Sequence, residues 1–146
     1  MSFIHVKGPA RAEAFLKTAS TAIAIGSVVA WDGASGYVAQ AVTGSLRLVG
    51  VSLRKVASTD DDFASNTLLN VVLPGEDDVF EATVSVTATQ ANVGRQYDLT
   101  VVAAGTAQAV DLSATTSKVV TVVGFINSST VLVKLNGYYD YANKAN

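Results

Sequence analysis

Apolar and polar residues alternate along much of this chain, most regularly from Val79 to Thr87. Such a period of two places alternate side chains on opposite faces of a pleated strand. The residues predicted to face the core are Phe80, Ala82, Val84 and Val86. A second region, residues 119–137, holds two valine-rich runs around Asn127-Ser128-Ser129, which predicts a hairpin with a tight turn. Its second strand is predicted to bury Val131, Val133 and Leu135.

Further strands are predicted by the same criterion. They cover residues 27–31, 37–42, 46–53, 67–73, 97–103 and 107–112. The phase of the alternation changes beside Gly50, which predicts a β-bulge near Val49 and Gly50. Ala10–Ala24 fits either a short helix or a strand, and residues 58–66 form a polar connection in which Ser58 or Thr59 would cap one helical turn. Eight or nine short strands are typical of an all-β sandwich or small barrel.

The chain divides by pattern into three parts. Residues 1–25 comprise an extended N-terminal arm and an alanine-rich segment, residues 26–137 form the β domain, and residues 138–146 form a C-terminal tail. The arm has no clear amphipathic pattern, so we expect Ser2–Lys7 to add a strand to the sheet of a neighbouring subunit. Deleting residues 1–7 is then predicted to leave the domain folded and to weaken assembly.

Composition narrows the function. The 146 residues include 23 Val, 4 Ile and 14 Thr, only 15% are charged, and the formal net charge is -2. Scattered Lys and Arg in an acidic chain argue against binding nucleic acid, and a weakly charged surface predicts contact with a partner. Cysteine is absent, which excludes disulfides and thiolate metal sites. We expect no membrane span and no secretion signal, hence synthesis in the cytoplasm.

Residues able to carry catalysis are scarce. His5 is the one histidine, no Gly-x-Ser-x-Gly motif occurs, and Glu76 and Glu81 give no reason to expect a carboxylate pair. We therefore predict no catalytic residue, cofactor or metal site, and no enzyme. Two acidic loops, Asp60–Asp62 and Glu76–Asp78, leave open the binding of a cation, although a calcium-loop spacing is missing.

Aromatic and apolar residues near the termini are the candidates for a partner interface, because Trp and Tyr are frequent interface anchors. Trp31 fits core closure as well, and Arg95 is expected to be solvated or to pair with Asp98 or a partner carboxylate. The candidate interface residues are Phe3, Ile4, His5, Val6, Trp31, Arg95, Tyr138, Tyr139 and Tyr141.

Several segments together resemble the head-decoration, or capsid-cement, proteins of tailed bacteriophages. They are Ala24–Gly33 (AIGSVVAWDG), Val49–Ser52 (VGVS), Asp60–Ser65 (DDDFAS), Val71–Ala82 (VVLPGEDDVFEA), Val93–Leu99 (VGRQYDL), and Val123–Phe125 (VGF) followed by Val131–Asn136 (VLVKLN). The matching order and spacing cover about residues 26–137, most of the chain.

This resemblance implies a small β-barrel or β-tulip-like domain on the exterior of a virion capsid. It also implies a homotrimer at three-fold or quasi-three-fold positions, bound to the major capsid protein, with no catalytic residue. We expect such an oligomer to hold neighbouring capsomers together against internal DNA pressure, since many modest contacts add up. The alternatives are another virion or extracellular β-module, such as a fibre, spike or glycan-binding domain, and, less favoured, an enzyme.

Overall fold

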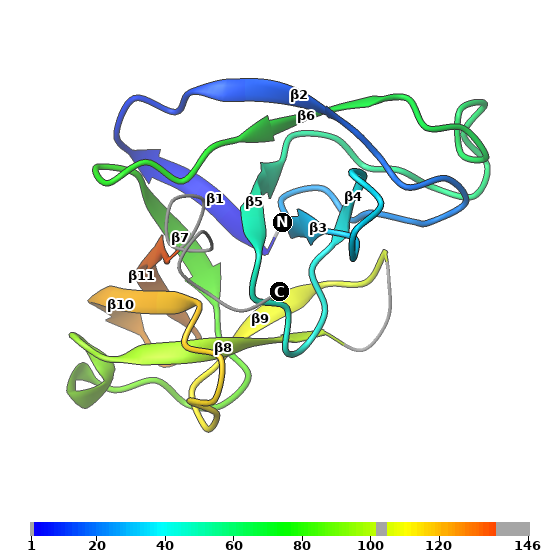
Figure 1. The fold of residues 1–146 in the computed structure, drawn as a ribbon. Helices are drawn as coiled ribbons and strands as arrows, with labels where there is room; N and C mark the ends of the chain where they lie inside the picture. The colour runs from blue at the N-terminus through cyan, green and yellow to red at the C-terminus, as the bar shows by residue number, and fades with distance from the viewer. Residues whose placement is uncertain (1, 102–104, 137–146) are drawn as a thin grey trace.

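The computed structural model describes residues 2–101 and 105–136. These residues form eleven strands and one short 3-10 helix, η1 (Gln90–Asn92) (Figure 1). The strands are β1 (Phe3–Lys7), β2 (Ala12–Leu16), β3 (Val28–Trp31), β4 (Val38–Gln40), β5 (Leu48–Ser52), β6 (Leu68–Val72), β7 (Val79–Thr83), β8 (Gln96–Val101), β9 (Gln108–Asp111), β10 (Val120–Asn127) and β11 (Thr130–Leu135). The predicted all-β class is confirmed.

Two antiparallel sheets build the fold. The six-stranded sheet has the order β1-β7-β11-β10-β8-β9, and the five-stranded sheet has the order β2-β6-β5-β3-β4. Each sheet curls, so that strands far apart in its order touch at one isolated parallel bridge. These bridges join Lys17 to Val38 and Val84 to Val110. Neither sheet closes into a barrel, and the architecture is that of a sandwich.

Two apolar cores hold the sheets. The larger core lies between them and takes Phe3, Phe80 and Val133 from one sheet and Val28 and Val51 from the other. The second core lies on the opposite face of the five-stranded sheet, where loop residues such as Ile23 and Val56 cover it. Consequently β5 is buried along its whole length. Burial on both faces explains why this strand reads as a nearly continuous apolar run.

Most of the predicted strands are confirmed. The predicted turn at residues 127–129 is also confirmed, and in it the Ser129 N–H donates to Asn127 Oδ1 at 2.9 Å. The predicted bulge is confirmed, because Val29 pairs with Gly50 and Ala30 pairs with Leu48, which leaves Val49 unpaired. The prediction for residues 79–87 is right only in its first half. β7 ends at Thr83, and the Val86 side chain is exposed rather than buried.

Two ambiguous segments are resolved by the structure. The alanine-rich segment contains a strand, β2, and no helix is assigned to it. Residues 58–66 form successive turns rather than a helix capped by Ser58 or Thr59. Backbone bonds from Asp60 N–H to Ala57 O (3.0 Å) and from Phe63 N–H to Asp60 O (3.1 Å) close these turns.

The prediction of a separate N-terminal arm is wrong. Residues 3–7 form β1, which pairs with β7 of the same chain, so the strand completes its own sheet. The Phe3 side chain is fully buried in the larger core. Deleting residues 1–7 would therefore open that core, and the free arm expected to reach a neighbouring subunit is not present.

Candidate docking surfaces

The outer face of the six-stranded sheet carries an apolar group of residues that we call the outer strip: Ile4, Val6, Val123 and Leu132. Pairing sets Ile4 of β1 opposite Glu81 of β7, Glu81 opposite Leu132 of β11, and Leu132 opposite Gly124 of β10. Ile4 and Leu132 therefore lie in one row across these strands, with Glu81 between them. Ile4 and Val6 are 42% and 47% exposed. Exposed apolar side chains that gather on one sheet face are a feature of interaction sites.

A bulge in β10 extends the outer strip. Val122 pairs with Val133 and Gly124 pairs with Leu132, so Val123 has no partner across the strands and its side chain is exposed. Beyond it, Phe125 and Ile126 are 40% and 43% exposed where β10 approaches its turn. The sequence analysis missed these three residues. Their signal was the break in alternation at Val122-Val123, two adjacent valines that cannot both face the core of a regular strand.

Some of the predicted interface residues are exposed, and others are buried in the protein. Ile4 and Val6 lie on the exposed face of β1, whereas Phe3 is buried in the core and His5 turns toward Phe80, with the two rings edge to face at a centroid distance of 5.4 Å. Trp31 is half-buried and packs edge to face on Phe15 at 5.7 Å, so it closes the second core.

The remaining predicted interface residues are Arg95 and the three tyrosines of the C-terminal tail. Arg95 is exposed, and the carboxylate of Asp98, its predicted partner, is taken by other groups. Asp98 accepts hydrogen bonds from the backbone N–H groups of Thr116, Ser117 and Lys118, at 3.1, 2.7 and 2.7 Å. Tyr138, Tyr139 and Tyr141 lie outside the described residues.

The second acidic loop is organised by Asp78. Its Oδ1 accepts hydrogen bonds from His5 Nε2 at 2.8 Å and from the Ala10 N–H at 3.1 Å, and its Oδ2 accepts one from the Gly75 N–H at 2.9 Å. Burial of this carboxyl opposes ionisation, but the bonds from Ala10, His5 and Gly75 outweigh it, and the pKa of Asp78 lies below its ordinary value. Asp78 thus joins the segment after β1 to the segment before β7.

This pKa shift predicts a pH dependence of stability. A carboxyl whose pKa is lowered by folding stabilises the fold above its unfolded-state pKa of 3.8, and that contribution is lost as the pH falls through the folded-state value. At neutral pH we expect Asp78→Asn to lower the free energy of unfolding by about 1–3 kcal/mol. The two charged carboxylate oxygens of Asp78 both accept hydrogen bonds, whereas asparagine offers one uncharged amide oxygen. The variant should then lose less stability than the wild type on acidification, as measured by urea unfolding at pH 7 and pH 3.

Asp77→Asn is the matched control for this measurement, because Asp77 is the exposed neighbour of Asp78. We expect its free energy of unfolding to stay within about 0.5 kcal/mol of the wild-type value. Equal acid sensitivity of the wild type and Asp78→Asn would contradict the stabilising role of this carboxylate.

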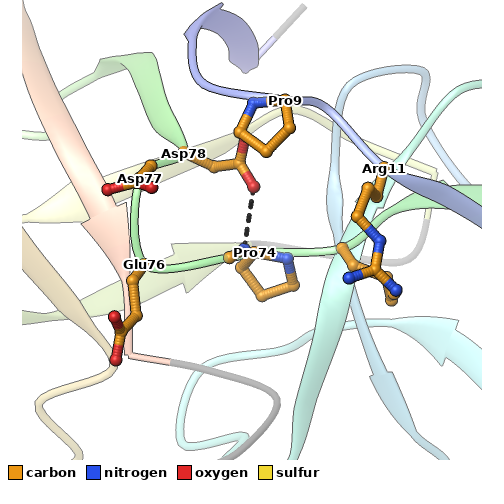
Figure 2. Close-up of a pocket in the computed structure, with 8 residues that line it drawn as sticks. Pro9, Arg11, Pro74, Glu76, Asp77 and Asp78 are labelled. Carbon is orange, nitrogen blue, oxygen red and sulfur yellow. Dashed lines mark hydrogen bonds between the residues drawn. The ribbon is translucent and has the colours of Figure 1, made fainter.

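Beside Asp78 lies a recess of about 250 Å³, lined by Pro9, Arg11, Leu73, Pro74, Gly75, Glu76, Asp77 and Asp78. Figure 2 shows the side chains of Glu76 and Asp77 extending away from the Asp78 carboxylate, which is directed at the backbone of Gly75. Since the hydrogen bonds already described engage both Asp78 oxygens, this carboxylate is structural rather than free to act on a substrate.

The first acidic loop is also structural. Asp62 accepts a hydrogen bond from Arg54 Nη2 at 2.8 Å and one from Thr67 Oγ1 at 2.5 Å. These bonds from Arg54 and Thr67, with the positive charges nearby, lower the pKa of Asp62 to about 2. Asp60 Oδ2 accepts the Ala57 N–H at 2.8 Å. Within residues 2–101 and 105–136, no group of three or more His, Cys, Asp or Glu is placed to hold a metal ion.

Strands β2 and β6 of the five-stranded sheet carry a second exposed region. In β2 every residue except Phe15 is exposed, and Leu16 pairs with Leu68 of β6. Leu16 and Leu68 are 45% and 60% exposed. The sequence analysis missed this region, because which face of a strand is covered depends on what packs against it in the tertiary structure.

Comparison with known proteins identified no relative of this chain. Neither the models of known protein families nor the curated proteins gave a match to this chain. Across the part of the chain that the structure describes, no helix has the length and apolar character needed to cross a bilayer.

Proposed function

We propose that this protein is a structural component of a virion, a cement protein that docks on the exterior of an expanded phage capsid and links neighbouring capsomers. The observation that carries the proposal is the outer strip, in which the exposed Ile4, Val6 and Val123 and the half-buried Leu132 gather on one face of the six-stranded sheet. The sequence resemblance to capsid-decoration proteins favours the major capsid protein as the partner and a homotrimer as the docked form. Each copy then contributes modest contacts that add up across the shell.

The hydrogen-bonded aspartates also support a binding role rather than catalysis. Asp62, Asp78 and Asp98 use their carboxylates to hold loops through the hydrogen bonds described above. Polar groups committed to the fold in this way are not available for proton transfer. The outer strip, by contrast, exposes apolar side chains, and such surfaces favour contact with another protein.

The test is cosedimentation of the purified protein with expanded heads of the phage that encodes it, prepared without this protein. We expect the wild type to bind and the double variant Ile4→Asp with Leu132→Asp to bind at least about tenfold more weakly, because two charges would enter an apolar contact. Val42→Asp is the matched control, since Val42 is 50% exposed and lies outside the outer strip, in the loop that follows β4. Failure of the wild type to bind such heads would refute the proposal.

A further inference from the structure

The outer strip is interrupted by one carboxylate. Glu81 lies on the outer face of β7, and the pairing sets Ile4 of β1 on one side of it and Leu132 of β11 on the other. It therefore occupies the middle of the row and not its rim. The Glu81 side chain is half-buried, and within residues 2–101 and 105–136 it forms neither a hydrogen bond nor an ion pair.

Lys134 shares this face of the sheet with Glu81. It lies two residues beyond Leu132 on β11, so its side chain emerges on the same side of the strand as that of Leu132. Diagonal neighbours of this kind lie about 7–8 Å apart in a sheet. Across the described part of the chain, Lys134 and Glu81 do not form an ion pair. The charge of Glu81 is therefore open to solvent and is not neutralised by the protein.

Docking on the outer strip would remove water from Glu81. A surface that covers both Ile4 and Leu132 must also cover the residue between them. A carboxylate that loses its water without gaining a partner is costly. A purely apolar partner therefore does not suit this face, whereas a partner with a positive charge at this place does.

We propose that the partner docked on the outer strip places an arginine side chain against Glu81, within an otherwise apolar contact. A guanidinium group donates two parallel hydrogen bonds to a carboxylate and is less strongly hydrated than an ammonium group, so it suits a contact from which water is excluded. This pairing rests on the proposed function and deepens it, because it specifies the chemistry of the capsid surface that covers β7. Glu81 then discriminates against apolar surfaces that carry no positive charge.

The first experiment compares variants of Glu81 in cosedimentation with the heads described above. We expect Glu81→Gln to bind at least about tenfold more weakly than the wild type, because the arginine of the partner would be left without its carboxylate. Glu81→Lys should bind more weakly still, since like charges would meet. Glu13→Gln is the matched control, the same substitution at an exposed residue of the other sheet, and should bind as the wild type does.

The folded state of these variants is measured separately. Because Glu81 has no partner within the described residues, we expect Glu81→Gln and the wild type to unfold at the same urea concentration. Weaker head binding by Glu81→Gln is then a property of the docking surface and not of an unfolded fraction.

A second experiment needs no heads. It uses two short peptides of alternating valine and threonine that differ only in the central residue, arginine or glutamate. In NMR titrations of the wild type, we expect the arginine peptide to give the larger chemical-shift changes at the amides of β1, β7 and β11. Glu81→Gln should abolish the difference between the two peptides, and Glu13→Gln should retain it.

Two results would overturn the arginine contact: equal head binding by Glu81→Gln and the wild type, or equal shifts with both peptides. If Glu81 serves only to keep copies from associating through their outer strips, Glu81→Gln would gain mass in light scattering and bind heads as the wild type does. Binding of both proteins to heads with equal affinity would reject this inference alone. Failure of the wild type to bind heads, with the arginine peptide still preferred, would reject the capsid proposal alone.

Discussion

Replacing Lys17 by methionine is expected to lower the free energy of unfolding by about 3 kcal/mol, because its carbonyl partners would lose a charged donor, and each buried acceptor left unsatisfied costs about 1–3 kcal/mol. Lys17 is fully buried, and its Nζ donates to the carbonyl oxygens of Asp62 at 2.8 Å and Ser65 at 2.6 Å, with Phe63 O at 3.4 Å. Methionine fills most of the same volume but donates no hydrogen bond. The carbonyl groups of the 58–66 loop would then be left without this donor.

The measurement is urea unfolding of Lys17→Met beside Lys55→Met, a control in which an exposed lysine is replaced. We expect the control to stay within about 0.5 kcal/mol of the wild type. Hydrogen exchange should also show faster exchange of the amides in residues 58–66 of Lys17→Met. A Lys17→Met protein as stable as the control would show that the ammonium group does not hold this loop.

Gly50→Ala is expected to destabilise the protein by about 3 kcal/mol or more, or to prevent folding, because strands β5 and β6 approach closely at this point. A Cβ atom on Gly50 would lie 2.1 Å from the carbonyl oxygen of Val72 and 2.7 Å from Val71 Cγ1. The first of these atoms belongs to the backbone of a neighbouring strand. It cannot move without disturbing the pairing of β5 with β6.

Gly124→Ala is the matched control, since a Cβ there would meet Leu132 Cδ1 at 3.0 Å, the end of a flexible side chain. We expect it to cost less stability than Gly50→Ala in the same urea titration, because Leu132 can rotate away. If the two variants unfold at the same urea concentration, the steric account of Gly50 is wrong.

These two sites show what keeps the docking surfaces rigid. Lys17 lies where the edges of the five-stranded sheet meet, since it bridges to Val38 and its ammonium fixes the loop over the second core. Gly50 lets strands β5 and β6 of the same sheet approach closely. Neither residue touches the outer strip. We expect their variants to weaken capsid binding only through loss of the folded state.

The strands and their turns were largely readable from the sequence because alternation, β-branched residues and turn formers act locally. The 127–129 turn and the bulge at Val49 are examples, since each depends on a few adjacent residues. The N-terminal segment was misassigned for the opposite reason. Its pattern is short, and only the pairing of β1 with β7, some 75 residues away in the chain, shows that Phe3 belongs to the core.

The candidate surfaces depended even more on the tertiary structure. Ile4 and Val6 were named from the sequence, but as parts of a free arm rather than as the exposed face of a paired strand. Leu16, Leu68 and Val123 gave no local sign of exposure, because an apolar residue in a strand reads the same whether its face is covered or open. Similarly, nothing in the local sequence indicated the hydrogen bonds that Asp62 forms with Arg54 and that Asp78 forms with His5.

The sequence by itself determined that this chain is an all-β protein, because strand periodicity and β-branched residues are local properties. Only the tertiary structure decided that the sheets curl, that β1 completes its own sheet and that the end of β2 meets β4. Those outcomes depend on contacts between residues distant in the chain, whose free energies no local pattern records.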